Sequence, residues 1–288
     1  MVAHLIGVLF DGISYGSLLF LIGVGLAVTL GLMNFVNLAH GAFAMLGGYS
    51  LVVVMSRFGV PFLAALPIAF ATAAAAGAVL ERTLYRRLYR SSHLDQVLFS
   101  IGLTFMAIAA ATYVWGPGQQ PVRVPAFLQG QVRIFGIDLG AYRLFLVGVV
   151  IVITLALGYL VERTRFGTQI RASVDNQQVS AGLGINVDRI FCLTFALGSG
   201  LAGLGGGLGV EVLGLDPTFP LKYIVYFLLV AAVGGAGTIK GPLVAALILG
   251  IFDVAGKYYV PEIGAFVIYA LMIVLLILFP SGLYGRRA

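Results

Sequence analysis

Three strongly polar side chains, those of Asn34, Asn37 and His40, stand close together within a run from 12 to 56 that contains no Asp, Glu, Lys or Arg. A buried amide or imidazole without hydrogen-bond partners costs about 1–3 kcal/mol. These side chains must therefore face the protein interior, a watery cavity or the aqueous edge. They could line a translocation path at a broken helix, or the two asparagines could cap helix ends at a short turn. The pattern by itself favours the turn, because capping asparagines are common.

A second candidate is the glycine-rich stretch from 233 to 242, Val-Gly-Gly-Ala-Gly-Thr-Ile-Lys-Gly-Pro. Such a loop can cradle a phosphate, but this one lacks the Gly-Lys-Ser/Thr ending of a nucleotide-binding P-loop and follows an apolar run instead of a strand. We therefore expect a break between two half-helices, as in many transporters. The residues assigned to this helix break are Gly234, Gly235, Gly237, Gly241 and Pro242.

Residues for catalysis or metal binding are sparse. Cys192 is the single cysteine, and the three histidines, His4, His40 and His93, are far apart in the sequence. This argues against a disulfide framework, a cysteine metal cluster and a metalloenzyme site. No clustered carboxylates or Ser/His arrangement point to an integral-membrane enzyme. We expect a chain that is not an enzyme and that binds no metal or cofactor itself.

The elements that position these residues follow from the composition. Of 288 residues, 60% are hydrophobic and 10% charged, and the mean hydropathy is +1.06. Most of the chain must therefore lie in hydrocarbon. The runs without Asp, Glu, Lys or Arg are 12–56, 58–80, 96–122, 144–161, 190–210, 223–239, 241–252 and 263–285. The first is long enough for two crossings of about 20 residues each.

These runs predict a single all-α integral membrane domain over 1–288 with eight or nine transmembrane segments. The runs 223–239 and 241–252 are short, which suggests broken or re-entrant helices. Because the runs are continuously apolar and do not alternate, a β-barrel is excluded. Glycines between Gly198 and Gly209 have the small-xxx-small spacing of a close helix contact.

The basic residues predict the orientation. With nine segments, 11 Lys and Arg residues fall on one side and 6 on the other, and the richer side is expected to be cytoplasmic. The N-terminus is then outside and the C-terminus inside. This bias also explains the net charge of +6 better than nucleic-acid binding does. The segment 116–142 becomes an outer loop. It contains Gly116, Pro117, Pro121 and Pro125, which favour turns and extended chain and are compatible with a docking lip.

The longest polar cytoplasmic segment is 162–189. Within it, Ile170, Val174 and Val179 fall roughly on one face of a short helix. A solvated loop and a helix that presses on a cytoplasmic partner are both compatible with this pattern. The glycines that would end such a helix are Gly182 and Gly184.

Four motifs together resemble the LivH-type inner-membrane permease family. They are Asn-Phe to Ala-His-Gly at 34–41, the stretch 171–189 with Gly-Ile-Asn-Val-Asp-Arg at its end, Gly-Gly-Ala-Gly-Thr-Ile-Lys-Gly-Pro at 234–242, and Phe-Pro-Ser-Gly-Leu-Tyr-Gly at 279–285. The motifs occur in the family's order and cover about residues 5–285. Members are membrane subunits of ABC importers for branched-chain amino acids and related hydrophobic or amide substrates.

The resemblance implies an ABC importer permease fold in the bacterial inner membrane. It implies a second related permease, two cytoplasmic ATPase subunits that bind the ATP and Mg, a periplasmic or extracellular solute-binding protein, surrounding membrane lipid and no nucleic acid. The segment 162–189 then contacts the ATPases, and its assigned coupling residues are Arg171, Asp175, Gly184, Ile185 and Asn186. The candidate substrate path comprises Asn34, Asn37, His40, Ser100, Thr104 and Thr194.

Two alternatives remain beside the branched-chain amino acid importer. The same class of importer could carry urea, short amides or aromatic acids. An ion-coupled secondary transporter would place ionisable groups at the membrane midplane. Here the nearest candidates, Glu211 and Asp253, fall near predicted outer ends, which argues against ion coupling.

Overall fold

The computed structural model describes residues 2–33, 35, 37–89, 91–134, 136–235, 239–279 and 282–284. Nearly all of this chain is helical. The elements are α1 (Val2–Met33), α2 (His40–Phe58), α3 (Phe62–Leu80), a π-helical turn η1 (Glu81–Tyr85), α4 (Arg86–Leu88), α5 (His93–Trp115), a 3₁₀ turn η2 (Ala126–Leu128), β1 (Gln131–Ile134), β2 (Ile137–Gly140), α6 (Ala141–Arg163), α7 (Arg165–Asp175), α8 (Gln177–Gly182), α9 (Val187–Leu213), α10 (Phe219–Gly234), α11 (Lys240–Tyr259) and α12 (Gly264–Leu278).

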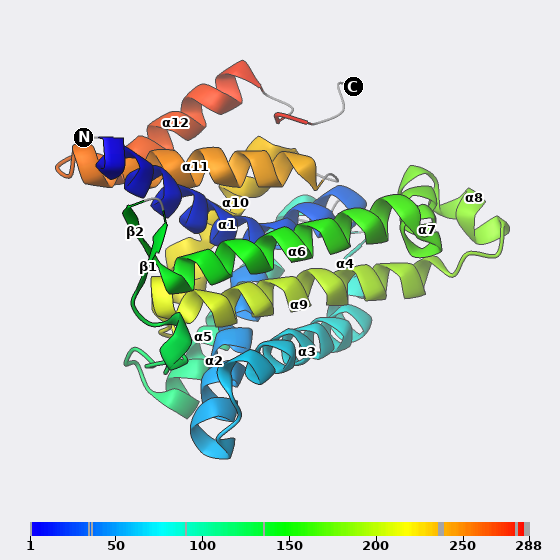
Figure 1. Cartoon of the computed structure of the whole chain (residues 1–288). Helices are drawn as coiled ribbons and strands as arrows, with labels where there is room; N and C mark the ends of the chain where they lie inside the picture. Colours follow the sequence, from blue (N-terminus) through cyan, green and yellow to red (C-terminus); the bar gives the residue numbers. More distant parts are fainter. Residues whose placement is uncertain are drawn as a thin grey trace.

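The long helices form one bundle with two distinct ends (Figure 1). The strands β1 and β2 and the start of α1 lie at one end, which we call the hairpin end. The short helices α7 and α8 extend beyond the bundle at the opposite end, which we call the projection end. Successive long helices connect these two ends.

Within the described residues, seven helices are long and apolar enough to cross a membrane: α1, α2, the α3–α4 stretch, α5, α6, α9 and α11. The apolar helices α10 and α12 are shorter. Every charge-free run therefore contains the expected helix or, for the first run, two. The charge-free run 241–252 underestimates the length of α11, because this helix includes the charged residues Asp253 and Lys257 and reaches Tyr259. This helix is long enough to span by itself, so it is not a broken segment.

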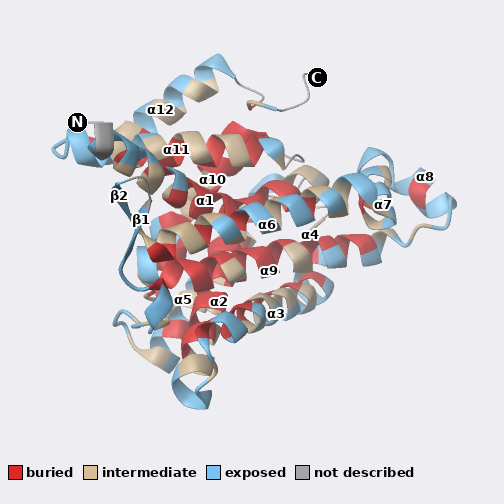
Figure 2. Ribbon diagram, in the orientation of Figure 1, coloured by how far each residue is buried: buried red, intermediate tan, exposed pale blue. Residues whose placement is uncertain are grey.

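The centre of the bundle is α9, which packs against α1, α2 and α3 and is mostly buried (Figure 2). Its glycines allow the backbones to meet. A Cβ atom added at Gly47 of α2 would collide with the backbone of Gly203, and one added at Gly206 would collide with the backbone of Ala44. The predicted close helix contact is confirmed, and it follows the small-residue packing expected where lipid supplies no hydrophobic driving force between helices.

The loop 116–142 departs from the all-α prediction. Residues 131–134 and 137–140 form an antiparallel hairpin in which Gln131 pairs with Gly140. Apolar and polar residues alternate in both strands, as expected for a sheet with two different faces. The ion pair between Arg133 and Asp138, at 3.1 Å, links the strands. Extended chain was predicted here, but its pairing was not.

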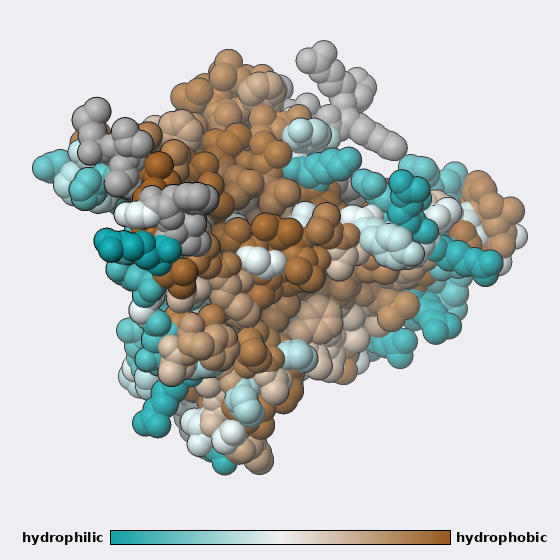
Figure 3. Space-filling model, viewed as in Figure 1, coloured by the Kyte–Doolittle hydropathy of each residue, from teal (hydrophilic) through white to brown (hydrophobic). Residues whose placement is uncertain are grey.

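The surface has the polarity pattern of a membrane protein. Figure 3 shows hydrophobic residues across the middle of one face and hydrophilic residues at the hairpin end and around α7 and α8. The described basic residues divide between the two ends as the sequence predicted. At the projection end lie Arg82, Arg86, Arg87, Arg163, Arg165, Arg171, Arg189 and Lys240; at the hairpin end lie Arg57, Arg123, Arg133, Arg143, Lys222 and Lys257. Which end faces the cytoplasm stays a prediction.

Candidate substrate path and coupling segment

The turn between α1 and α2 is organised by Asn37. Its buried Oδ1 accepts hydrogen bonds from the backbone N–H of Ala39, at 3.0 Å, and from the hydroxyl of Tyr85, at 2.9 Å. The first bond closes a tight turn of the kind that Asn favours, and the second fixes this turn to η1. Asn34 lies outside the described residues.

His40, the first residue of α2, is buried and joins two helices. Its Nε2 lies 2.8 Å from the carbonyl oxygen of Ile22 in α1. A carbonyl oxygen can only accept, so Nε2 carries the proton in this contact. The imidazole ring is nearly perpendicular to that of Phe227 in α10, with 6.4 Å between the ring centroids.

Two hydroxyl residues of α5 hold the same turn from the other side. Ser100 Oγ accepts from the backbone N–H of Leu38 at 3.1 Å and donates to the carbonyl of Val97 at 3.0 Å. Thr104 Oγ1 donates to the carbonyl of Ser100 at 2.8 Å. The structure thus brings together Asn37, His40, Ser100 and Thr104. Thr194 is also buried, on α9, and its hydroxyl has no hydrogen-bond partner within the described residues.

The predicted helix break lies between α10 and α11, which are separate helices. Gly234 ends α10, Gly235 has a positive φ of 89°, and Gly241 and Pro242 lie buried in the first turn of α11. A Cβ atom at Gly234 would collide with Pro242, so the two helix ends touch. Gly237 lies outside the described residues.

A second motif of the sequence packs onto this break. The N–H groups of Leu283 and Tyr284 donate to the carbonyls of Val233 and Gly234, at 2.7 and 3.3 Å. The last carbonyls of a helix have no partner within it. The segment 282–284 therefore completes the end of α10.

The segment 162–189, for which a coupling role is predicted, contains two short helices where one was expected. Helix α7 ends at Asp175 and α8 begins after Asn176, whose Oδ1 accepts from the N–H of Val179 at 3.0 Å. This cap divides the expected apolar face. Ile170 is buried against the bundle, whereas Val179 is 57% exposed on α8.

The other assigned coupling residues shape the backbone of this segment. Gly184, with a φ of 84°, donates to the carbonyl of Ala181, and Ile185 donates to that of Ser180, both at 3.0 Å. These two bonds are a Schellman motif, in which glycine supplies the left-handed residue. Asn186 then caps α9 by accepting from the N–H of Arg189 at 3.0 Å.

Further polar contacts connect the projecting helices and their surroundings at the projection end. Arg171 donates to the carbonyl of Val161, and Arg86 pairs with Asp188. Tyr89, just beyond α4, donates to the buried carboxylate of Glu81 at 2.7 Å. Burial and this acidic neighbour raise the pKa of Tyr89 well above its ordinary value.

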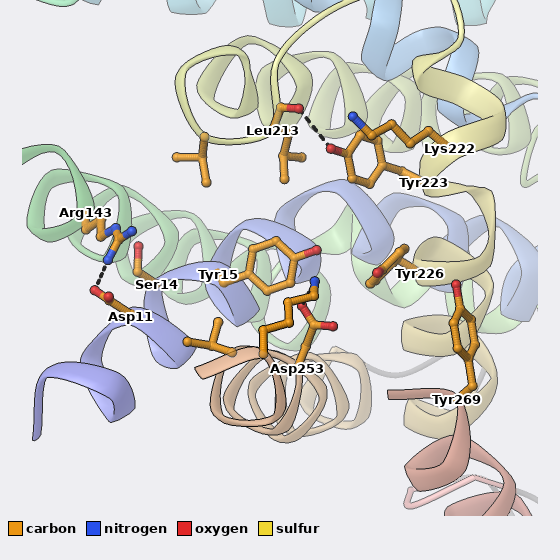
Figure 4. Close-up of a pocket in the computed structure, with 13 residues that line it drawn as sticks. Asp11, Ser14, Tyr15, Arg143, Leu213, Lys222, Tyr223, Tyr226, Asp253 and Tyr269 are labelled. Atoms are coloured by element: carbon orange, nitrogen blue, oxygen red, sulfur yellow. Dashed lines mark hydrogen bonds and ion pairs between the residues drawn. The ribbon is translucent and has the colours of Figure 1, made fainter. Parts of the chain in front are cut away.

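A cavity of about 430 Å³ opens at the hairpin end, between α1, α6, α9, α10, α11 and α12 (Figure 4). It holds the ion pairs of Arg143 with Asp11 and of Lys257 with Asp253, the latter at 2.6 Å. The remaining lining residues are Ser14, Tyr15, Val212, Leu213, Lys222, Tyr223, Tyr226, Val254 and Tyr269.

None of the cavity residues was among the predicted site residues. One signal in the sequence could have revealed the cavity. Asp253 and Lys257 are an i,i+4 acid–base pair in an apolar segment, and ionisable residues in such segments face the protein interior or a cavity.

The bundle and its polar cavity define a multi-pass helical membrane protein. Residues 8–276 match the protein family described as "Branched-chain amino acid transport system / permease component". The chain belongs to this family, and the resemblance drawn from the four motifs is confirmed.

The relatives match nearly end to end. The chain is 29% identical over 294 residues to the high-affinity branched-chain amino acid transport system permease protein LivH of Escherichia coli (strain K12), with 96% of this chain and 94% of the relative covered. It is 26% identical over 296 residues to the permease protein BraD of Pseudomonas aeruginosa, with 98% and 96% covered. It is 27% identical over 297 residues to a probable LivH of Methanocaldococcus jannaschii, with 96% and 92% covered. No solved structure matches the chain.

Proposed function

We propose that this permease is the membrane-spanning subunit of an ATP-driven ABC importer for branched-chain amino acids. The observation that carries the proposal is the nearly full-length match to relatives named as permeases of branched-chain amino acid transport systems. The helical bundle supports a transport path through the chain, and the helices that project at one end support a contact with a further subunit.

The proposed assembly contains a second related permease, two cytoplasmic ATPase subunits and an external solute-binding protein. ATP and Mg bind to the ATPases, and this chain contributes no catalytic residue. The assembly lies in the bacterial inner membrane, with the projection end in the cytoplasm. The larger share of described basic residues at that end supports this orientation.

The projecting helices α7 and α8 are proposed to contact the ATPases. Val179 and Leu183 support this, because they are 57% and 76% exposed at a polar end of the bundle. Exposed apolar side chains within a polar surround are typical of protein contacts. Arg171, Asp175, Gly184, Ile185 and Asn186 give α7, α8 and the start of α9 their shape.

The substrate path itself stays a prediction. Its candidate residues are Asn34, Asn37, His40, Ser100, Thr104 and Thr194. The hydrogen bonds of Asn37, His40 and Ser100 support a role in holding the turn between α1 and α2. We place the path beside this turn, so that a movement of α7 and α8 can reach it through α1 and α9, which α7 contacts.

Uptake by the reconstituted complex tests the function. Proteoliposomes with the partner subunits and the binding protein should take up L-leucine only when ATP is supplied. Preferential uptake of urea, a short amide or an aromatic acid would change the substrate and leave the importer class in place. Uptake driven by an ion gradient without ATP would contradict the proposal.

A charge on the exposed apolar face tests the coupling. Leu183→Asp should reduce ATP-driven uptake several-fold, because a desolvated carboxylate is costly in a protein contact. Phe127→Asp is the matched control, since Phe127 is 66% exposed but belongs to η2 near the hairpin end. Equal uptake in both variants and the wild type would remove α8 from the coupling contact.

A further inference from the structure

Asp253 is a buried carboxylate whose hydrogen bonding is incomplete. It is 1% exposed, and its Oδ2 lies 2.6 Å from Nζ of Lys257. Its Oδ1 is buried and has no hydrogen-bond partner within the described residues. A buried carboxylate oxygen without a hydrogen-bond donor is costly. This oxygen therefore needs a donor that the described chain does not supply.

The carboxylate belongs to the wall of the cavity at the hairpin end. It lies six residues, or about 9 Å along the helix, before the last residue of α11. In Figure 4 it faces the same space as the rings of Tyr15 and Tyr226. The volume of about 430 Å³ is typical of small-molecule sites, which span about 300–1,000 Å³.

The same cavity offers a cation without an acidic partner. Arg143 pairs with Asp11, and Lys257 pairs with Asp253. The ammonium of Lys222 lies over the ring of Tyr223, 5.3 Å from its centroid, and makes no ion pair within the described residues. The cavity therefore has one acceptor and one cation available to a ligand.

We propose that this cavity binds the backbone end of a free amino acid, in its zwitterionic form. Oδ1 of Asp253 accepts from the α-ammonium, and Lys222 pairs with the α-carboxylate. Val212, Leu213 and Val254 supply the apolar surface for a branched side chain. This site deepens the proposed function and rests on it, because it gives the imported amino acid a receiving site at the end opposite to α7 and α8.

The charges favour a zwitterion over a simple ion. A lone anion would pair with Lys222 and leave Oδ1 of Asp253 without a donor. A lone cation would satisfy Oδ1 and leave Lys222 without an acid. A ligand with both charges on one carbon satisfies both groups.

Competition binding with analogues that lack one charge tests the site. The purified complex, without nucleotide and without the binding protein, is titrated with radiolabelled L-leucine. The competitors are 4-methylpentanoate, which lacks the ammonium, and 3-methylbutylamine, which lacks the carboxylate. For the wild type, each analogue should bind about tenfold more weakly than L-leucine, as expected when a charged hydrogen bond is lost.

Two variants, Asp253→Asn and Lys222→Gln, each remove the partner of one charge of leucine. In each variant, the analogue that lacks this charge should lose its disadvantage relative to leucine, and the other analogue should keep it. In Asp253→Asn, leucine binding should weaken and the penalty for 4-methylpentanoate should fall to about twofold, while the penalty for 3-methylbutylamine stays. Lys222→Gln should show the reverse, and its exposed position makes folding a minor concern. Arg133→Gln is the matched control, because this hairpin cation lies outside the cavity.

The outcomes separate the site from the proposed function. If ATP-driven leucine uptake is present but both penalties are the same in all variants, the cavity holds only water and the site is wrong. If the wild-type complex takes up no leucine at all, the proposed function itself is wrong. Both the site and the proposed function are supported if Asp253→Asn removes only the weaker binding of 4-methylpentanoate and Lys222→Gln removes only that of 3-methylbutylamine.

Discussion

The turn between α1 and α2 and the cavity at the hairpin end both bury polar side chains in an apolar bundle, but they differ in how these groups are bonded. At the turn, Asn37 and His40 bond to atoms of neighbouring elements. In the cavity, Asp253 keeps one oxygen without a partner in the described chain. The partnered groups hold the turn, whereas the unpartnered oxygen of Asp253 requires a donor from outside the described chain.

The two regions also differ in packing. Aromatic rings fill the surroundings of the turn, where Phe35, Tyr85 and Phe195 have centroids 5.2 and 4.7 Å apart in successive pairs. The cavity has open volume beside its charges. Substitutions at the turn should therefore lower stability, and substitutions in the cavity should change binding.

The largest expected effect on stability is that of Asn37→Leu. This change leaves the N–H of Ala39 and the hydroxyl of Tyr85 without their acceptor, and each buried group left unpaired costs about 1–3 kcal/mol. We expect the free energy of unfolding to fall by about 2–4 kcal/mol, measured by thermal unfolding in detergent.

Uptake by the same variant tests its place in the path. A several-fold loss of uptake per folded complex would support Asn37 as a path residue. Unchanged specific uptake would remove it from the path. An unchanged melting temperature would contradict the structural role that its bonds indicate.

Tyr85→Phe should have a smaller effect on the same turn. It removes one bond to Asn37 but keeps the ring within the aromatic cluster, and Asn37 still accepts from Ala39. A loss of about 1 kcal/mol is expected, with uptake per folded complex unchanged. A loss of unfolding free energy as large as that of Asn37→Leu would mean that the bond from the Tyr85 hydroxyl, and not the bond within the turn, accounts for most of the stabilisation by Asn37.

Asp253→Asn, in the cavity, should lower the stability less than the substitutions at the turn between α1 and α2 do. Lys257 is 49% exposed in its side chain, so water can solvate its charge when the carboxylate is removed. We expect a change in unfolding free energy within about 1 kcal/mol, because removing a buried carboxylate that lacks one hydrogen-bond donor offsets the loss of its ion pair. A loss of several kcal/mol in the melting experiment would show that the cavity charges are structural.

Thr104→Val is expected to have the smallest effect. Its hydroxyl donates at 2.8 Å to the carbonyl of Ser100, one turn earlier in the same helix, and lies 3.5 Å from the carbonyl of Leu38, the outer limit of a hydrogen bond. Removing such a local bond within a helix leaves the backbone ladder intact. The change should be within about 0.5 kcal/mol in thermal unfolding, because Val keeps the shape of this buried side chain and its methyl group needs no hydrogen-bond partner, which offsets the lost bond. A strong loss of uptake in this stable variant would assign Thr104 to the path.

The sequence predicted the helices well because apolar run length is a direct consequence of bilayer thickness. It missed the end of α11, since the charges of Asp253 and Lys257 interrupt the run while the helix continues. It also missed the division of α7 from α8. That division depends on a single hydrogen bond, which Asn176 Oδ1 accepts from the N–H of Val179. The composition of the segment does not predict this bond.

The candidate site was harder to predict for a different reason. Asn37 and His40 stand out because they interrupt an apolar run, but their partners, Tyr85 and the carbonyl of Ile22, are distant in sequence. Which polar group is bonded and which is open depends on these tertiary contacts. The cavity joins residues from Asp11 to Tyr269, and apart from the i,i+4 pair of Asp253 and Lys257 no local spacing relates them.

The backbone bonds of Leu283 and Tyr284 to the end of α10 also set an order of events during synthesis. Leu283 leaves the ribosome 50 residues after Val233, which is a delay of a few seconds at about 5–20 residues per second. During that time the last carbonyls of α10 lack their final donors. A nascent chain that pauses after α11 therefore has an α10 whose C-terminal end still lacks these two hydrogen bonds.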